Sequence, residues 1–272
     1  MTTTYLDEII AEHRRQAEAD TRLIATLEEA LSGAGAVRPF LGALGARAVT
    51  RPEDLAVIAE VKRRSPAKGP LAPSLDPALL ATLYEAGGAR ALSVLTDADF
   101  FGGSPEDLRI ARLACGLPVL RKDFTVARRD CYDARIMGAD ALLLIVAALS
   151  NEELADLHAF AVSLGLAVLV EVHDEDELAR ALRVEPQLIG VNQRDLHSFA
   201  VDPERAVRVG AKIPEGIGRV AESGITSHED MVRLADAGFH AVLVGERLVT
   251  ADDPAVELRR LRRGDAHGTG DT

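Results

Sequence analysis

The residues Ile58-Ala59-Glu60-Val61-Lys62-Arg63-Arg64-Ser65-Pro66 place an acid and a base at the end of an apolar run. If this run is a β-strand, side chains two positions apart share a face, so Glu60 and Lys62 point in the same direction. Taken alone, the pair fits an exposed strand end with solvated charges better than it fits a catalytic site. The stretch becomes informative only if other strands of the chain end in the same way.

Other apolar runs do end in chemically useful residues. Val119-Leu120-Arg121-Lys122-Asp123-Phe124 and Ala167-Val168-Leu169-Val170-Glu171-Val172-His173 end in charged groups. Three more end in small or polar residues: Leu188-Ile189-Gly190-Val191-Asn192-Gln193-Arg194, Val220-Ala221-Glu222-Ser223-Gly224 and Val242-Leu243-Val244-Gly245-Glu246. The carboxyl ends of the strands in a parallel barrel open on one face. The sequence therefore predicts that these endings meet in one pocket.

The order of apolar runs and helical patterns indicates the fold class. The runs are nearly continuous in hydrophobicity, as expected of strands covered on both faces. They fall at 57–62, 91–96, 119–124, 141–146, 167–172, 188–193, 219–223 and 241–246. Helical periodicity occupies 77–87, 105–114, 128–137, 151–163, 174–184, 203–210, 227–237 and 254–262. This alternation predicts a parallel sheet in an α/β protein, and the 272 residues suit one (β/α)8 TIM barrel domain spanning 1–272.

Residues outside the barrel pattern lie at the two ends of the chain. Helical patterns near 4–20 and 21–31 predict that residues 1–50 form a helical extension packed on the barrel near its active face. The tail 264–272 is small, polar and glycine-rich, which predicts disorder. Within the barrel, a glycine (Gly88, Gly138 or Gly238) joins a helix to a strand at three places, where a positive φ is expected.

Composition excludes several classes of partner. The net charge of -12 argues against nucleic acid and against an anionic membrane surface, both of which require basic patches. An anionic substrate must instead be bound by a few local Lys, Arg and backbone N–H groups. Cys115 and Cys131 form no CxxC pair and no disulfide framework, which favours a reducing cytoplasm. No run approaches the length of a membrane span, and no apolar leader is visible.

Motifs for metals and nucleotides are not found. The seven histidines are scattered without the spacing of a metal site. Neither GxGxxG after a strand nor GxxxxGK[ST] occurs, so no dinucleotide or Walker-type nucleotide is expected. We expect the protein to work without a metal or cofactor.

With these strand endings in place, the chain resembles the indole-3-glycerol phosphate synthases, the tryptophan-pathway members of the ribulose-phosphate-binding barrels. The resemblance extends from about residue 50 to residue 262. Its most specific stretches are Ala59–Pro66, Leu120–Phe124, Leu169–His173, Gly190–Leu196 and Ala221–Ile225, with Phe100–Ser104 fitting as well. No single stretch would be decisive, but chance does not account for all of them in order.

The resemblance implies a reaction and its catalytic residues. Carboxyphenylamino-deoxyribulose phosphate closes a ring and loses CO2 and water, without a cofactor, to give indole-3-glycerol phosphate. By resemblance Lys122 is the general acid beside the ribulose carbonyl, where it would stabilise the developing oxyanion. Lys62 would hold substrate anions and assist proton transfer. Glu171 corresponds to the general base, Glu60 to a carboxylate that tunes the lysines, and Asn192 to an amide that orients carboxylates.

The resemblance also implies residues that bind the substrate. Arg194 would provide a planar fork, either for a substrate carboxylate or for an ion pair with Glu60 and Glu222. The phosphate site would use backbone N–H groups after the last two strands and a short helix N-terminus. The complete set expected to bind substrate is Ser65, Phe101, Arg194, Glu222, Ser223, Gly224, Gly245 and Glu246.

Gly245-Glu246-Arg247 departs from the family pattern, because many members have Ser or Thr after the glycine. A carboxylate beside a phosphate would repel it. Glu246 must therefore point away from the phosphate, or the site differs here.

Two alternative functions of such a barrel would require different residues. A sibling barrel, such as phosphoribosylanthranilate isomerase or the histidine-pathway isomerase, would use a Cys/Asp or Asp/Asp pair, whereas this chain offers Lys122 and Glu171. A non-catalytic barrel serving as an interaction subunit would be expected to have lost Lys122 or Glu60, and both are present. A monomer suffices for such a barrel, but the sequence decides neither the oligomeric state nor whether the product enters primary or secondary metabolism.

Overall fold

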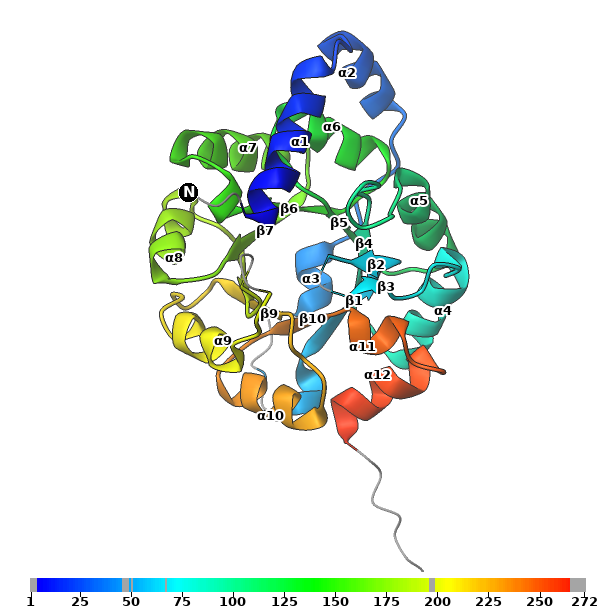
Figure 1. Cartoon of the computed structure of the whole chain (residues 1–272), viewed down its shortest axis with the longest axis vertical. Coiled ribbons are helices and arrows are strands. Elements are labelled where there is room, and N and C mark those ends of the chain that lie inside the picture. The colour runs from blue at the N-terminus through cyan, green and yellow to red at the C-terminus, as the bar shows by residue number, and fades with distance from the viewer. Residues whose placement is uncertain (1–3, 46–48, 50, 67, 196–198, 265–272) are drawn as a thin grey trace, which may run out of the picture.

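Eight parallel strands close into a barrel surrounded by helices (Figure 1). The computed structural model describes residues 4–45, 49, 51–66, 68–195 and 199–264. Around the barrel the strands follow the order β1-β4-β5-β6-β7-β8-β9-β10, and β10 pairs with β1. The predicted (β/α)8 barrel is confirmed.

The strands lie where the sequence predicts them, to within two residues at either end. Their bounds are β1 Ala56–Val61, β4 Ala91–Leu95, β5 Val119–Lys122, β6 Ala141–Ile145, β7 Ala167–Val172, β8 Leu188–Asn192, β9 Gly218–Glu222 and β10 Ala241–Val244. The prediction for the last strand ran too far, because Gly245 and Glu246 leave the strand to begin a helix. A small antiparallel hairpin, β2 Arg64–Ser65 with β3 Gly69–Pro70, lies in the loop after β1.

The helices of the barrel also follow the predicted pattern. They are α4 Pro77–Gly87, α5 Pro105–Ala114, α6 Arg128–Ile136, α7 Asn151–Ser163, α8 Glu175–Ala181, α9 Pro203–Gly210, α10 His228–Asp236, α11 Glu246–Val249 and α12 Pro254–Arg263. Short 3-10 turns occupy Pro52–Asp54, Val146–Ala148 and Leu182–Val184. Gly88, Gly138 and Gly238 have φ values of 93°, 97° and 76°, as expected before a strand.

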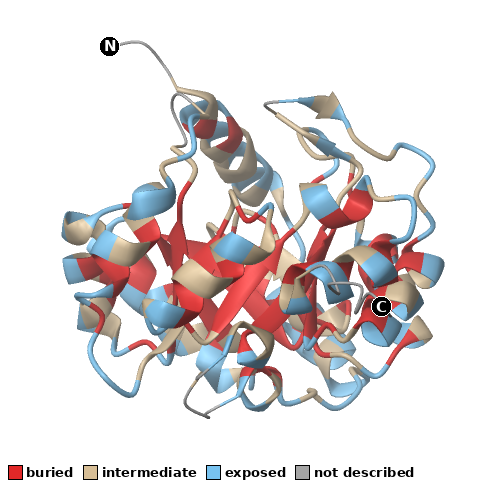
Figure 2. Cartoon of the chain, turned by 90° about the horizontal axis from the view of Figure 1, so that it is seen from below, coloured by how far each residue is buried: buried red, intermediate tan, exposed pale blue. Residues whose placement is uncertain are grey.

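Two apolar layers make up the core. The outer layer packs the strands against the surrounding helices, so the strands are buried on both faces (Figure 2). The inner layer fills the barrel, and it includes Phe40 and Leu44 of α3 Phe40–Leu44. These two residues pack with Ala56 and Ala91 at the beginnings of β1 and β4. The helix α3 therefore seals the end of the barrel at which the strands begin.

The rest of the N-terminal segment lies elsewhere: α2 Ile24–Ser32 packs against α6 on the outside of the barrel, and α1 Tyr5–Ala19 lies over the opposite end (Figure 1). The helix α1 stands above the barrel near β5, β6 and β7 (Figure 1). Arg14 on α1 forms an ion pair with Glu153 of α7 at 2.6 Å and donates to the Ala148 carbonyl. The first helix is thus held over the end where the strands finish.

Two further observations concern the predicted tail and membrane association. Residues 265–272, most of the tail predicted to be disordered, lie outside the described residues. Within the described part of the chain, no helix combines the length and apolar character needed to cross a bilayer.

Candidate active site

A cavity of about 610 Å³ opens where the barrel strands end. The residues that line it include every site residue predicted above: Glu60, Lys62, Ser65, Phe101, Lys122, Glu171, Asn192, Arg194, Glu222, Ser223, Gly224, Gly245 and Glu246. The strands alone explain this convergence, because β1, β5, β7, β8, β9 and β10 each bring one or more of these residues to the same face.

Lys122, the last residue of β5, lies among buried carboxylates. Its Nζ is 3.4 Å from Oε2 of Glu171 and 3.9 Å from Oε2 of Glu222. Burial alone would lower the pKa of Lys122, but Glu171, Glu222 and Glu60 together raise it above its ordinary value. The side chain is therefore an ammonium group that can donate a proton or a hydrogen bond within the cavity.

The two glutamates beside Lys122 differ in protonation. Burial favours the neutral form of both, but Lys122, His173 and the amide of Asn192 lower the pKa of Glu171. Burial raises the pKa of Glu222 well above its ordinary value, and the neighbouring charge of Glu171 raises it further. Of the two, Glu171 is thus the group that favours the carboxylate form able to accept a proton, and Glu222 the group that favours the protonated form.

Glu60 and Lys62 project from the end of β1 on the same side, as their spacing predicts. Their charged atoms are 2.5 Å apart, and both side chains are largely buried. Gly245 packs directly on this pair: a Cβ there would collide with Oε1 of Glu60 and lie 3.2 Å from Nζ of Lys62. The glycine is therefore required by the close approach of the backbone to the ion pair.

Asn192 is the last residue of β8, and Arg194 lies two residues after it. The Asn192 amide donates to Oε1 of Glu171 at 3.1 Å, and its oxygen accepts the Arg194 backbone N–H at 3.0 Å. The Arg194 guanidinium donates to the Phe199 carbonyl at 3.0 Å. Among the described residues we find no ion pair of Arg194 with Glu60 or Glu222, so this arginine is anchored by the loop after β8.

Ser223 and Gly224 contribute backbone groups to the wall of the cavity. Ser223 and Gly224, directly after β9, both have positive φ values, 63° and 73°. For a serine this is an uncommon conformation of the kind that clusters at functional sites. A hydrogen bond of 2.6 Å from the Gln193 amide to the Ser223 carbonyl holds the turn. The turn faces the start of α11 and, together with Ser65, borders the part of the cavity predicted to bind phosphate.

Glu246, the unexpected carboxylate, forms an ion pair with Lys68 in the loop after β1. Lys68 also lines the cavity, although the sequence reasoning did not single it out. The charge of Glu246 is therefore balanced by a lysine, and Lys68 lies close enough to reach an anion bound beside α11. The position of Lys68 two residues after Ser65-Pro66 was the only available signal in the sequence.

The remaining lining of the cavity is apolar. Phe101 and Phe124 lie with their ring centroids 6.1 Å apart. Leu143 and Ile145 of β6 and Leu243 of β10 form the floor, which is continuous with the inner core of the barrel. Phe124 follows Asp123 in one of the quoted strand endings, but we did not predict it as a site residue.

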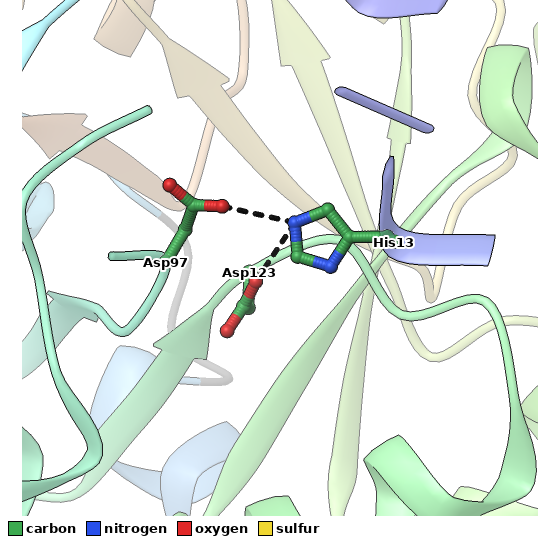
Figure 3. A group of neighbouring side chains, drawn as sticks. All are labelled: His13, Asp97 and Asp123. Atoms are coloured by element: carbon green, nitrogen blue, oxygen red, sulfur yellow. Dashed lines mark hydrogen bonds and ion pairs between the residues drawn. The ribbon is translucent and has the colours of Figure 1, made fainter. Parts of the chain in front are cut away.

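His13, Asp97 and Asp123 form a group whose ligand atoms lie within 4.8 Å of one another, a spacing that could hold a metal ion (Figure 3). Nε2 of His13 lies 2.9 Å from Asp97 and 3.8 Å from Asp123. Asp97 also accepts the N–H groups of Phe100 and Phe101. The spacing of the histidines in the sequence does not predict this group, because it joins α1 to the ends of two strands that are distant in the chain.

The surroundings of these three residues favour an ion pair over a metal site. Asp123 already forms a 2.9 Å ion pair with Arg121, whose positive charge would oppose a bound cation. Burial alone would lower the pKa of His13, but the hydrogen bond to Asp97 and the charge of Asp123 raise it. The group therefore fastens α1 to the loops that border the cavity.

Comparisons with known proteins agree with this geometry. The family model described as indole-3-glycerol phosphate synthase matches residues 6–261. Proteins named indole-3-glycerol phosphate synthase from Polaromonas naphthalenivorans and Kineococcus radiotolerans are 49% and 45% identical to the chain. The first alignment covers 82% of this chain and 84% of the relative, and the second covers 97% of each.

Solved structures support the fold alone. A thiamine phosphate pyrophosphorylase from Pyrococcus furiosus superposes with a TM-score of 0.57 at 15% identity, over 78% of this chain and 95% of that one. A designed, cube-shaped protein cage superposes with a TM-score of 0.53 at 17% identity, over 77% of this chain and 72% of that one.

Proposed function

This chain belongs to the indole-3-glycerol phosphate synthase family, and on that premise we propose which of its side chains carry out the reaction. The family reaction converts 1-(2-carboxyphenylamino)-1-deoxyribulose 5-phosphate to indole-3-glycerol phosphate, with loss of CO2 and water. The observation that carries the assignment is the Lys122 ammonium group, held between Glu171 and Glu222 at the strand ends.

Lys122 is the general acid of the ring closure. When the aromatic carbon attacks the ribulose carbonyl, negative charge builds on the carbonyl oxygen. An ammonium group in a partly desolvated cavity stabilises that charge and can donate a proton to it. Because its pKa is raised by the surrounding carboxylates, Lys122 is charged at the start of each cycle.

Glu171 is the general base. After decarboxylation restores the aromatic ring, dehydration removes the hydroxyl group and one proton from the adjacent methylene carbon. The carboxylate of Glu171 accepts that proton, and the Asn192 amide orients it. Glu222, whose raised pKa favours its protonated form, supports Lys122 without adding a second full negative charge.

The Glu60–Lys62 pair provides a second source of protons and positive charge. The departing oxygen needs two protons to leave as water, whereas the methylene carbon supplies only one. Since the substrate carboxylate leaves as neutral CO2, each cycle takes up one proton from solvent. Lys62, with Glu60 2.5 Å away, can bind the substrate carboxylate and pass such a proton on.

The cavity has suitable surfaces for the rest of the substrate. Phe101, Phe124 and the leucines of the floor can cover the phenyl ring. At the opposite wall, N–H groups of the Ser223-Gly224 turn and the start of α11, with Ser65 and Lys68, can bind the phosphate. Arg194 stands at the rim as a further cation for the substrate.

Neither alternative function has support from the site. A sibling isomerase would need a cysteine or a pair of aspartates, but Cys115 and Cys131 are buried in the outer core layer. Asp123 lines the cavity but is paired with Arg121. A non-catalytic barrel would not require the buried Lys122 cluster, which is costly to desolvate.

We further propose that the enzyme acts in the cytoplasm and can do so as a monomer. The two free, buried thiols suit a reducing compartment. The described residues of a single chain bring together all the side chains to which we assign roles in the reaction.

The activity can be tested with the purified protein and synthetic 1-(2-carboxyphenylamino)-1-deoxyribulose 5-phosphate. We expect indole fluorescence to appear and to saturate with substrate concentration. Phosphoribosylanthranilate serves as the control substrate for the isomerase alternative. Turnover of that compound without indole formation would refute the proposed function.

A further inference from the structure

His173, the residue directly after β7, lies between two carboxylates. Its Nδ1 is 3.0 Å from Oε2 of Glu177 on α8, and its Nε2 is 3.5 Å from Oε1 of Glu171. Glu177 also accepts the His173 backbone N–H at 2.8 Å, which fixes the ring relative to the helix. The exposed fraction of the side chain rises along this series from 1% at Glu171 through 10% at His173 to 17% at Glu177.

The geometry of Nε2 indicates the charge on the ring. This atom is buried and has no hydrogen-bond partner within the described residues. A neutral ring that donates from Nδ1 to Glu177 would direct a lone pair at the ionised Glu171. A doubly protonated ring instead places an N–H group toward each carboxylate.

The electrostatic surroundings act in the same direction. Burial alone would lower the pKa of His173, but the hydrogen bond to Glu177 and the charges of Glu171 and Glu177 raise it above its ordinary value. Arg205 on α9 is the charged group that opposes this increase. The two carboxylates outweigh the single guanidinium group.

His173 can influence the reaction only through Glu171. It does not line the cavity, whereas Glu171 does. Oε1 of Glu171 faces Asn192 and His173, and Oε2 faces Lys122. The histidine therefore holds the oxygen that is turned away from Lys122.

We propose that His173 is a positioning residue for the general base: clamped by Glu177, its imidazolium group fixes the Glu171 carboxylate with Oε2 toward Lys122 and keeps it ionised. This role rests on the proposed role of Glu171. The ion pair also gives a pH dependence of definite sign. Because the pKa of His173 is raised, the imidazolium persists to higher pH than in an ordinary histidine and is lost as the pH increases through the raised pKa, so kcat should decline on the alkaline side.

The test compares three neutral replacements in the intact enzyme. His173→Leu removes both N–H groups, and we expect kcat to fall by about thirtyfold or more while KM changes by less than about threefold. His173→Gln retains one donor without charge, so kcat should fall less and lose the alkaline decline assigned to His173. His158→Gln, at a half-buried histidine on α7 outside the cavity, is the matched control and should leave both constants unchanged.

Glu177→Gln tests the clamp itself. An amide oxygen can still accept from Nδ1, but the charge that favours the imidazolium is lost. The alkaline decline of kcat should therefore move to lower pH by about one pH unit. The NMR titration of the His173 ring carbon should move by the same amount, and this readout does not depend on turnover.

Different results separate this proposal from the role of Glu171. If Glu171→Gln retains full kcat, Glu171 is not the base, whatever the titration shows. If Glu171→Gln is impaired but His173→Leu matches His158→Gln in kcat and in pH profile, the positioning role is wrong. An NMR titration showing a neutral His173 ring at pH 6 in the wild-type protein would overturn it as well.

Discussion

The two ends of the barrel differ in the side chains that they gather. Where the strands begin, α3 inserts Phe40 and Leu44 into the inner apolar layer. The buried Asp140 just before β6 is paired with Arg112 and does not line the cavity. Where the strands finish, Lys62 and Lys122 lie with Glu60, Glu171 and Glu222 around an open cavity. One end is filled with apolar side chains, whereas the other gathers charged side chains, which are costly to desolvate, around an open cavity. The comparison indicates that stability and catalysis are separated along the barrel axis.

The separation predicts that the largest catalytic effect arises from a strand end. Lys122→Met should lower kcat by about a thousandfold or more, because the developing oxyanion loses its acid. KM and the thermal unfolding profile should change much less. Indole fluorescence and circular dichroism measure the two effects on the same sample. A variant that keeps more than about a tenth of wild-type kcat would show that Lys122 is not the acid.

The opposite end should respond in the opposite manner. Phe40→Ala removes a side chain that is only 2% exposed, so the free energy of unfolding should fall by about 3–5 kcal/mol. At temperatures where the variant is folded, kcat should remain within about twofold of wild type. Leu113→Ala is the control, because Leu113 is an apolar residue that is 86% exposed. Equal destabilisation by both variants would mean that α3 is not a structural plug.

Within the catalytic end, the two neighbouring glutamates sharpen the comparison. Glu171→Gln removes an ionised base and should lower kcat by about a hundredfold at neutral pH. Glu222→Gln replaces a group whose raised pKa favours the neutral form with a neutral amide of similar shape, so kcat should fall by less than about tenfold. The steady-state kcat of both variants at pH 7 provides the measurement. The reverse order of effects would mean that the two carboxylates exchange these protonation states.

The smallest effect is expected where Glu246 departs from the family pattern. Because Glu246 is already paired with Lys68, Glu246→Ser should change KM by less than about tenfold, or roughly 1.4 kcal/mol if KM tracks binding. Gly245→Val should be far worse, because its side chain would collide with Glu60. Substrate titrations of both variants distinguish these effects. Hundredfold tighter binding by Glu246→Ser would indicate that the carboxylate faces the substrate anion.

The sequence predicts most of the fold because strand and helix patterns are local. The runs that became β1 and β4 to β10 ended near the predicted residues, and parallel strands necessarily bring their carboxyl ends together. The same reasoning predicts that Glu60, Lys122 and Glu171 share one cavity. The resemblance to a family suggested their roles. Neither the strand pattern nor the family resemblance requires knowledge of which distant segments are in contact.

The missed side-chain pairings depend on such distant contacts. Lys68 and Glu246 are 178 residues apart, and His13 and Asp97 are 84 apart. The plug α3 is a five-residue helix, which is too short to show a helical period in the sequence. The protonation difference between Glu171 and Glu222 depends on burial and on neighbouring charges, which no local pattern records.

The central claim is that the side chains at the strand ends suffice for the reaction. Its most direct test is to dialyse the wild-type enzyme against EDTA and then measure formation of indole-3-glycerol phosphate and CO2 from the synthetic substrate. We predict equal amounts of both products at the undialysed rate, with no added metal or nucleotide. Loss of activity that a divalent ion or a nucleotide restores would contradict the account.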